Sequence, residues 1–245
     1  VNKMKELEKD NLDALSYSIK AMMDSNPNTI FVNKIEMGDT TSYVGSLSLK
    51  QFAEIAIFAR ELPLMEKMVV IEPKTGRPSL KRDPKSLNDL TQREIDHKRE
   101  AALVDYLLDD RRKFPTALCV ITADWVDPKD SYDQNYWHEG INPKAKQDSC
   151  NYTALTSDMG LLKLDENFRI YALDGQHRLL GIKRLKELAE QGRVTLNYTT
   201  KKELSKDFPG IETTDLRKIL SERISVEFVI GVKKGETRSE AKERV

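Results

Sequence analysis

The feature that most constrains the fold is a stretch of strand-like sequence that runs directly into a helix-like one. Side chains alternate from Phe168 to Leu173, as in a strand with two faces. Apolar residues then recur at helical spacing from Leu179 to Leu188, with charged residues between them. Strands interspersed with helices are typical of α/β and α+β domains. We therefore expect an α+β or α/β fold, a mixed sheet with flanking helices.

The same two periodicities recur along the rest of the chain. Strands are expected at 29–36, 43–47, 117–122, 168–173 and 224–230, and helices at 1–23, from 49, from 91, at 179–188 and at 213–222. Two capping-box patterns, Ser48–Gln51 and Thr91–Glu94, mark the starts of the second and third helices. The apolar face of the helix after Ser48 is expected to continue to Ile57. Two polar segments without periodicity, 72–90 and 126–160, are expected to be long loops.

One hydrophobic core is expected between the sheet and the helices, because each element must bury its apolar face. Its expected members are Leu103, Leu107, Val120, Ile170, Ala172, Leu179, Ile182, Val226 and Phe228. We expect one domain over 29–232, a helical extension at 1–28 and the start of a further region at 233–245. The chain lacks an initial Met and stops in a charged stretch, so we expect both ends to be incomplete.

The composition excludes several classes of protein. The 40 basic and 40 acidic residues cancel, which excludes a uniformly basic protein that coats nucleic acid. The longest apolar run, 117–121, is far shorter than the ~20 residues of a membrane helix. Two cysteines and three scattered histidines predict neither a disulfide framework nor a metal site. Because the amino end has no apolar leader, we expect a cytoplasmic protein that does not bind membranes.

The turn between the strand and the helix, Asp174–Arg178, holds the residues best suited to chemistry. Gly175 lets the backbone approach a ligand, and the N–H groups of the following helix favour an anion. Arg178 offers a planar fork to phosphate oxygens, and His177 can bind a phosphate or move a proton near neutral pH. Asp174 can cap the helix, accept from a ribose hydroxyl or hold a metal-bound water. The turn thus predicts a phosphate or nucleotide site.

The alternative is a purely structural corner. In that interpretation Asp174 is only an N-cap, His177 is a packed core residue and Arg178 is a surface charge. Short constellations of this kind also recur by chance.

Residues 171–179, Tyr-Ala-Leu-Asp-Gly-Gln-His-Arg-Leu, resemble the motif that names the DGQHR-domain family. That family includes the DndB-like proteins of DNA phosphorothioate modification, a phage-defence system. The likeness covers roughly residues 40–232, and only the pentapeptide is specific. It implies a DNA-associated protein that acts with other DNA-modification proteins, and we expect it to form homo-oligomers.

A strand that ends in Gly-x-His-Arg before a helix is also similar to the ParB and sulfiredoxin superfamily. This similarity implies a ParB/sulfiredoxin-like sheet that binds ATP or CTP, alone or with Mg²⁺, through Gly175, Gln176, His177 and Arg178. Arg93 and Arg99 lie in the region where ParB-like folds carry a second phosphate-contacting arginine; the alternative for each is a solvated helix face.

One departure from sulfiredoxin bears on activity. Gln176 stands where sulfiredoxin has its reactive cysteine, so the repair of cysteine sulfinic acid is not expected. Cys119 is a poor substitute, because it lies in an apolar strand and burial raises the pKa of a thiol.

A second candidate site is the densest local excess of basic residues, in segment 74–85. This segment has one acidic residue and five basic residues, which are Lys74, Arg77, Lys81, Arg82 and Lys85. A flexible basic loop of this kind is suited to contact the phosphates of DNA. The alternative is an ordinary solvated loop.

Three functions are compatible with these residues. The first is a DNA-associated regulatory or accessory protein of a DNA-modification system, with a nucleotide-binding core and slow, switch-like hydrolysis. The second is a ParB-like NTPase or nuclease acting on DNA, in which Asp174 and His177 are catalytic and assist attack by water. The third is a non-catalytic scaffold of a modification complex.

Overall fold

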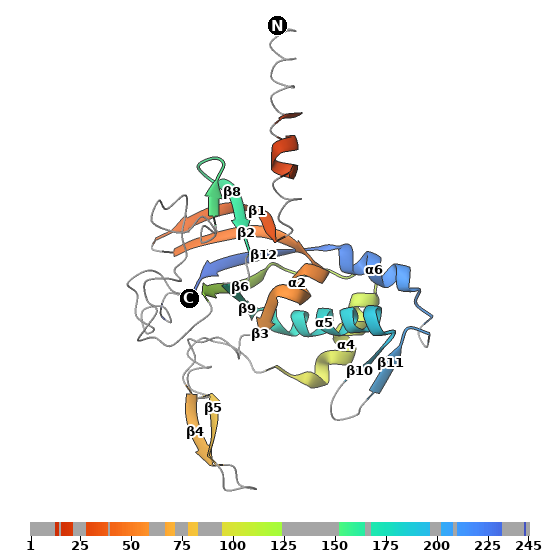
Figure 1. The fold of residues 1–245 in the computed structure, drawn as a ribbon. Helices are drawn as coiled ribbons and strands as arrows, with labels where there is room; N and C mark the ends of the chain where they lie inside the picture. Colours follow the sequence, from red (N-terminus) through yellow and green to blue (C-terminus); the bar gives the residue numbers. More distant parts are fainter. Residues whose placement is uncertain are drawn as a thin grey trace.

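Eight strands form one mixed sheet (Figure 1). The computed structural model describes residues 13–14, 16–21, 28–38, 40–58, 67–71, 78–82, 95–123, 152–164, 168–196, 202–207, 210–231 and 243. The strands are β1 (Thr29–Met37), β2 (Thr40–Ser48), β3 (Ala56–Phe58), β6 (Ala117–Ala123), β7 (Tyr152–Ala154), β8 (Met159–Lys163), β9 (Phe168–Asp174) and β12 (Arg223–Ile230). Their order across the sheet is β3-β9-β6-β12-β2-β1-β8-β7. β3 runs parallel to β9 and β6 parallel to β12, whereas the other neighbours are antiparallel.

Helices lie together on one side of this sheet (Figure 1). They are α2 (Leu49–Ile55), α4 (Glu100–Leu108), α5 (Gln176–Gln191) and α6 (Thr213–Ser221), and a short 3₁₀-helix, η2 (His97–Arg99), leads into α4. α5 is the central helix and contacts α2, α4 and α6. Buried side chains from these helices and from the sheet form one core, so the expected mixed sheet with flanking helices is confirmed.

The five predicted strands are all present. The helices predicted at 179–188 and 213–222 are present as α5 and α6. Residues 13–14 and 16–21 are helical, as expected for part of 1–23. The capping box at Ser48 is also confirmed. The backbone N–H of Ser48 donates to Oε1 of Gln51 at 3.0 Å, and the N–H of Gln51 donates to Oγ of Ser48 at 3.1 Å.

Two predicted helix boundaries are wrong. α2 ends at Ile55, and Ala56–Phe58 forms the edge strand β3 beside β9 instead of continuing the helix. α4 begins at Glu100, not near Thr91, whose own segment 91–94 lies outside the described residues. Asp96 caps η2 by accepting from the N–H of Lys98 at 3.0 Å, so a later cap starts the helical region.

Strands also occur in segments expected to be loops. β5 (Pro78–Arg82) lies within 72–90 and pairs with β4 (Lys67–Ile71) in a separate two-stranded sheet. β7 and the start of β8 lie within 126–160. A further hairpin, β10 (Arg193–Leu196) with β11 (Lys202–Ser205), follows α5. These strands form because partner strands satisfy their backbone hydrogen bonds. The periodicity of a single segment does not predict such a partner.

The predicted core is largely confirmed. Eight of its nine members are buried, and Leu103 is half-buried. Val120 is fully buried but does not belong to the core under the helices, whereas its neighbours Cys119 and Ile121 do. Because successive side chains of a strand point to opposite faces, Val120 lies on the other face of the sheet, and its assignment to this core was wrong.

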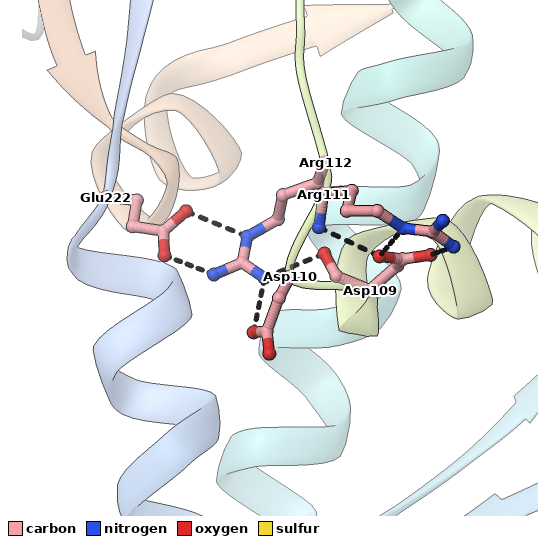
Figure 2. Close-up of polar contacts among 5 residues, drawn as sticks. All are labelled: Asp109, Asp110, Arg111, Arg112 and Glu222. Atoms are coloured by element: carbon pink, nitrogen blue, oxygen red, sulfur yellow. Dashed lines mark hydrogen bonds and ion pairs between the residues drawn. The ribbon is translucent and has the colours of Figure 1, made fainter.

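Arg112 ties the turn after α4 to the end of α6 (Figure 2). Its Nε donates to Oε2 of Glu222 at 2.8 Å, Nη2 bonds the second carboxylate oxygen, and Nη1 donates to the backbone oxygen of Asp109 at 2.9 Å. The hydrogen bonds that Arg112 donates to the Glu222 carboxylate raise the pKa of Arg112. The backbone oxygen of Glu222 accepts from the N–H of Leu49 at 2.8 Å. One residue, the C-cap of α6, therefore connects α6, α2 and the α4 turn.

Candidate functional site

The strand β9 turns into α5 at residues 174–178, called here the β9–α5 corner. Gly175 is the N-cap of α5 and has φ 97°, a left-handed conformation that favours glycine. The N–H of Leu179 donates to the backbone oxygen of Gly175 at 2.8 Å, which closes the first turn. Glycine has no side-chain oxygen, so no N-cap side chain satisfies the first-turn amides. Asp174 is therefore not the N-cap.

The strand is irregular directly before the corner. Along the β6–β9 pair, Leu118 lies opposite Asp174 and Cys119 lies opposite Ala172, so Leu173 is the extra residue of a register shift. Such irregularities re-aim a strand and often lie beside functional sites. Here the shift comes one residue before the chain enters the corner.

Arg178 is held over Gly175. Its Nη2 donates to Oδ2 of Asp174 at 3.0 Å, and Nη1 bonds the backbone oxygen of Pro115. A Cβ placed on Gly175 would lie 3.0 Å from Nη2 and 3.1 Å from Cζ. The Arg178 side chain is 11% exposed and that of Asp174 is 70% exposed. Arg178 is thus a largely buried group in contact with the turn, not the surface charge of the structural alternative.

His177 connects the corner to a distant segment. Its Nε2 accepts from the backbone N–H of Asp96 at 3.1 Å, across 81 positions of sequence. Nε2 therefore acts as an acceptor in this structure, as in a neutral imidazole. The contact holds η2 beside the first turn of α5, and η2 contains the exposed residues Lys98 and Arg99. Arg99, predicted as a second phosphate contact, lies three residues after Asp96 in the sequence.

Gln176, the first residue of α5, is 5% exposed. A polar side chain this deeply buried must find hydrogen-bond partners, because burying it without them is costly. The corner therefore holds one buried amide, one half-buried imidazole and one largely buried guanidinium within three consecutive residues.

A buried ionic cluster next to this site was missed from the sequence. Glu100 is fully buried, and its Oε1 lies 2.8 Å from Nδ1 of His97 and 3.5 Å from Nη2 of Arg184. Glu100 precedes Leu103 and Leu107 by three and seven residues, so helical periodicity places it on the apolar face. That spacing was a signal for its burial. A buried carboxylate is tolerated only when it is paired, so this cluster fixes α4 against α5.

Of the remaining predicted site residues, the structure describes Lys81 and Arg82, which lie outside the sheet that leads into the corner. Lys81 and Arg82 lie in β5, opposite Met68 and Lys67 of β4, in a sheet separate from that of β9. The other candidates lie outside the described residues: Arg93, Lys74, Arg77 and Lys85. Among the described residues, the predicted DNA contacts Lys81 and Arg82 thus lie on another element than the predicted phosphate contacts of the corner.

Cys119 is fully buried, and burial raises the pKa of its thiol well above the usual range. The thiol therefore stays protonated near neutral pH and is a poor nucleophile. The described parts of the chain contain no group of three or more His, Cys, Asp and Glu residues that could hold a metal ion. No helix among these parts is long and apolar enough to span a membrane.

Two surface hollows formed by described residues lie away from the corner. One, of about 610 Å³, is lined by α5 and the β10–β11 hairpin and includes Arg184 and Arg193. The other, of about 670 Å³, lies among α2, α5 and α6 and includes Lys50 and Arg217. Neither is lined by residues 174–178, so a ligand of the corner would not bind in these hollows.

No family model matches the chain, and no curated protein or solved structure is significantly similar to it.

Proposed function

We propose that the β9–α5 corner binds the phosphates of a nucleoside triphosphate. One observation carries the proposal: a largely buried guanidinium, that of Arg178, lies against a left-handed glycine at the uncapped start of a 16-residue helix. The helix dipole and its first amides favour an anion there, and the guanidinium adds a fork of donors. Among the described residues, Nε of Arg178 has no hydrogen-bond partner, so a donor remains for a ligand.

Two further cationic side chains, those of Lys98 and Arg99, support the same site. His177 holds η2 beside the corner, and the side chains of Lys98 and Arg99 are exposed there. We propose that Arg99 contacts the far end of the triphosphate. Arg93 is proposed as a further contact on sequence grounds alone.

The biological setting of the proposal comes from the resemblance to the DGQHR-domain family. In this setting the protein is a regulatory or accessory protein of a DNA-modification and phage-defence system. It binds DNA and other modification proteins, forms homo-oligomers and uses ATP or CTP, with Mg²⁺, as a switch. We propose that residues 29–232 form its ParB/sulfiredoxin-like domain. The catalytic roles of Asp174 and His177 stay predictions.

A structural corner is the second candidate. It is favoured by two contacts, since His177 and Arg178 both bond backbone groups of distant segments, at Asp96 and Pro115. In a protein where the corner is only a scaffold, these contacts fix α4 and β6 around α5 and no nucleotide binds at the corner.

Calorimetric titration with ATP, CTP and GTP, with and without Mg²⁺, distinguishes the two candidates. We expect Arg178→Ala to weaken binding by about 1.5–3 kcal/mol, the range for a hydrogen bond to a charged group. Arg217→Ala is the matched control, because Arg217 is exposed on α6. Equal affinities for the wild type and Arg178→Ala, or no binding together with a lowered melting temperature in Arg178→Ala, would favour the scaffold.

A further inference from the structure

We propose that Asp174 is an internal counter-anion of the site, which occupies Arg178 until a ligand phosphate displaces it. The inference rests on the proposed function of the corner and concerns its regulation. It starts from the ion pair between Nη2 of Arg178 and Oδ2 of Asp174 at 3.0 Å. A carboxylate and a phosphate oxygen are alternative partners for the same guanidinium edge.

The two partners are held very differently. Arg178 is 11% exposed, rests against Gly175 and is anchored through Nη1 to the backbone oxygen of Pro115. Asp174 is 70% exposed and does not cap α5. An exposed carboxylate loses little when it turns into water, because exposed ion pairs are weak. The guanidinium is therefore the fixed part of the site, and the Asp174 side chain is the part that moves.

The charge of Asp174 also acts on a ligand directly. A phosphate that contacts Arg178 must come close to this carboxylate, and two negative charges at such a distance repel each other. Both effects, competition and repulsion, lower the affinity of the wild-type corner for anions.

Ribose-binding and metal-binding roles for Asp174 predict the opposite effect. If the carboxylate accepted from a ribose hydroxyl or held Mg²⁺ beside the phosphates, its removal would weaken nucleotide binding. The sign of the change on Asp174→Asn therefore separates an internal counter-anion from these roles.

The test is a titration of the full chain and of Asp174→Asn with tripolyphosphate and with ATP, each in EDTA and in Mg²⁺. Asparagine keeps an oxygen that can accept from Arg178, removes the charge and carries an NH2 donor in place of the second oxygen. We expect Asp174→Asn to bind both probes about 3- to 10-fold more tightly than the wild type in EDTA, the size of one partly screened charge interaction. Raising the salt concentration should narrow this difference.

Asp158→Asn is the matched control, because it makes the same substitution at an exposed turn beside β8, far across the sheet from β9. It should leave both affinities unchanged. Arg178→Ala, measured alongside, reports on the proposed function itself.

If Arg178→Ala weakens binding as expected while Asp174→Asn binds as tightly as the wild type or more weakly, the site is correct and the counter-anion role is wrong. If Asp174→Asn binds the probes more weakly than the wild type only when Mg²⁺ is present, the carboxylate holds the metal and the inference is wrong. If neither the wild type nor Asp174→Asn binds either probe, the proposed function and this inference both fail.

Discussion

Single residues of the β9–α5 corner do more than one task. Gly175 provides the left-handed turn and also leaves the space into which the Arg178 guanidinium fits. Arg178 and His177 bond backbone atoms at Pro115 and Asp96, which come from different parts of the chain. A side chain bound in this way is placed in advance, and placing donors in advance is what a phosphate site requires.

Gly175→Ala tests the tight fit at this turn. We expect a decrease of about 2–3 kcal/mol in the free energy of unfolding, because the new Cβ is strained at φ 97° and lies 3.0 Å from Arg178. Gly210→Ala is the control, since Gly210 has φ 69° but nothing within 4 Å of its Cβ position. It should cost about 1 kcal/mol. Equal decreases in urea denaturation would mean that the Arg178 side chain does not fit tightly against the turn.

At the scale of elements, α5 organises the fold. α2, α4 and α6 all pack against it, and its first turn carries the corner. Helices α4 and α5 approach closely at Gly181, where a Cβ would lie 2.8 Å from Cβ of Leu103. The buried Glu100–Arg184 pair fixes the same two helices. The position of α4, and with it η2, therefore depends on this interface.

Gly181→Ala should reverse the usual effect of helix propensity. Alanine in a helix interior is favoured over glycine by about 1 kcal/mol, but the clash with Leu103 should convert this into a net destabilisation of about 1 kcal/mol. Denaturant unfolding of Gly181→Ala, Leu103→Gly and the double variant measures the coupling. In the double variant, we expect Leu103→Gly to relieve part of the destabilisation that Gly181→Ala causes. A Gly181→Ala protein more stable than the wild type would refute the close approach of the helices.

At the scale of the whole molecule, charge must be unevenly distributed if the protein is to bind DNA. The net charge is zero, so only a local concentration of basic residues can attract phosphates. Two of the basic residues of segment 74–85, Lys81 and Arg82, lie in β5 of the β4–β5 hairpin. This hairpin forms a two-stranded sheet of its own, separate from the main sheet (Figure 1).

Replacing Lys81, Arg82 and Lys85 by Ala should weaken binding to all duplexes alike. It should also reduce the slope of log affinity against log salt by about 0.9 for each DNA phosphate that the variant no longer neutralises. Fluorescence anisotropy over a range of salt concentrations measures both effects. The control is a triple Ala variant of Arg193, Arg217 and Lys218, which are exposed elsewhere. An unchanged slope would exclude these three residues as the DNA contact, and no binding at low salt would exclude DNA as a partner of this chain.

Most elements of the fold were predictable, because their signals are local. Strand β9, helix α5 and the Ser48 cap depend on neighbours only a few residues away in sequence. The motif of the corner was likewise visible, and so was its glycine turn. Burial also follows local periodicity, which is why most of the predicted core is buried and why the spacing of Glu100 on the face of α4 was informative.

The sequence by itself determined the strand–turn–helix unit at 168–191 and the residues of its corner. Only the tertiary structure decided where α4 begins, that Ala56–Phe58 is a strand, and which face of the sheet Val120 occupies. It also decided that Arg178 bonds Pro115 and that His177 bonds Asp96. These outcomes depend on partners 63 and 81 positions away in sequence, and no periodicity within one segment encodes which distant backbone group will be brought near.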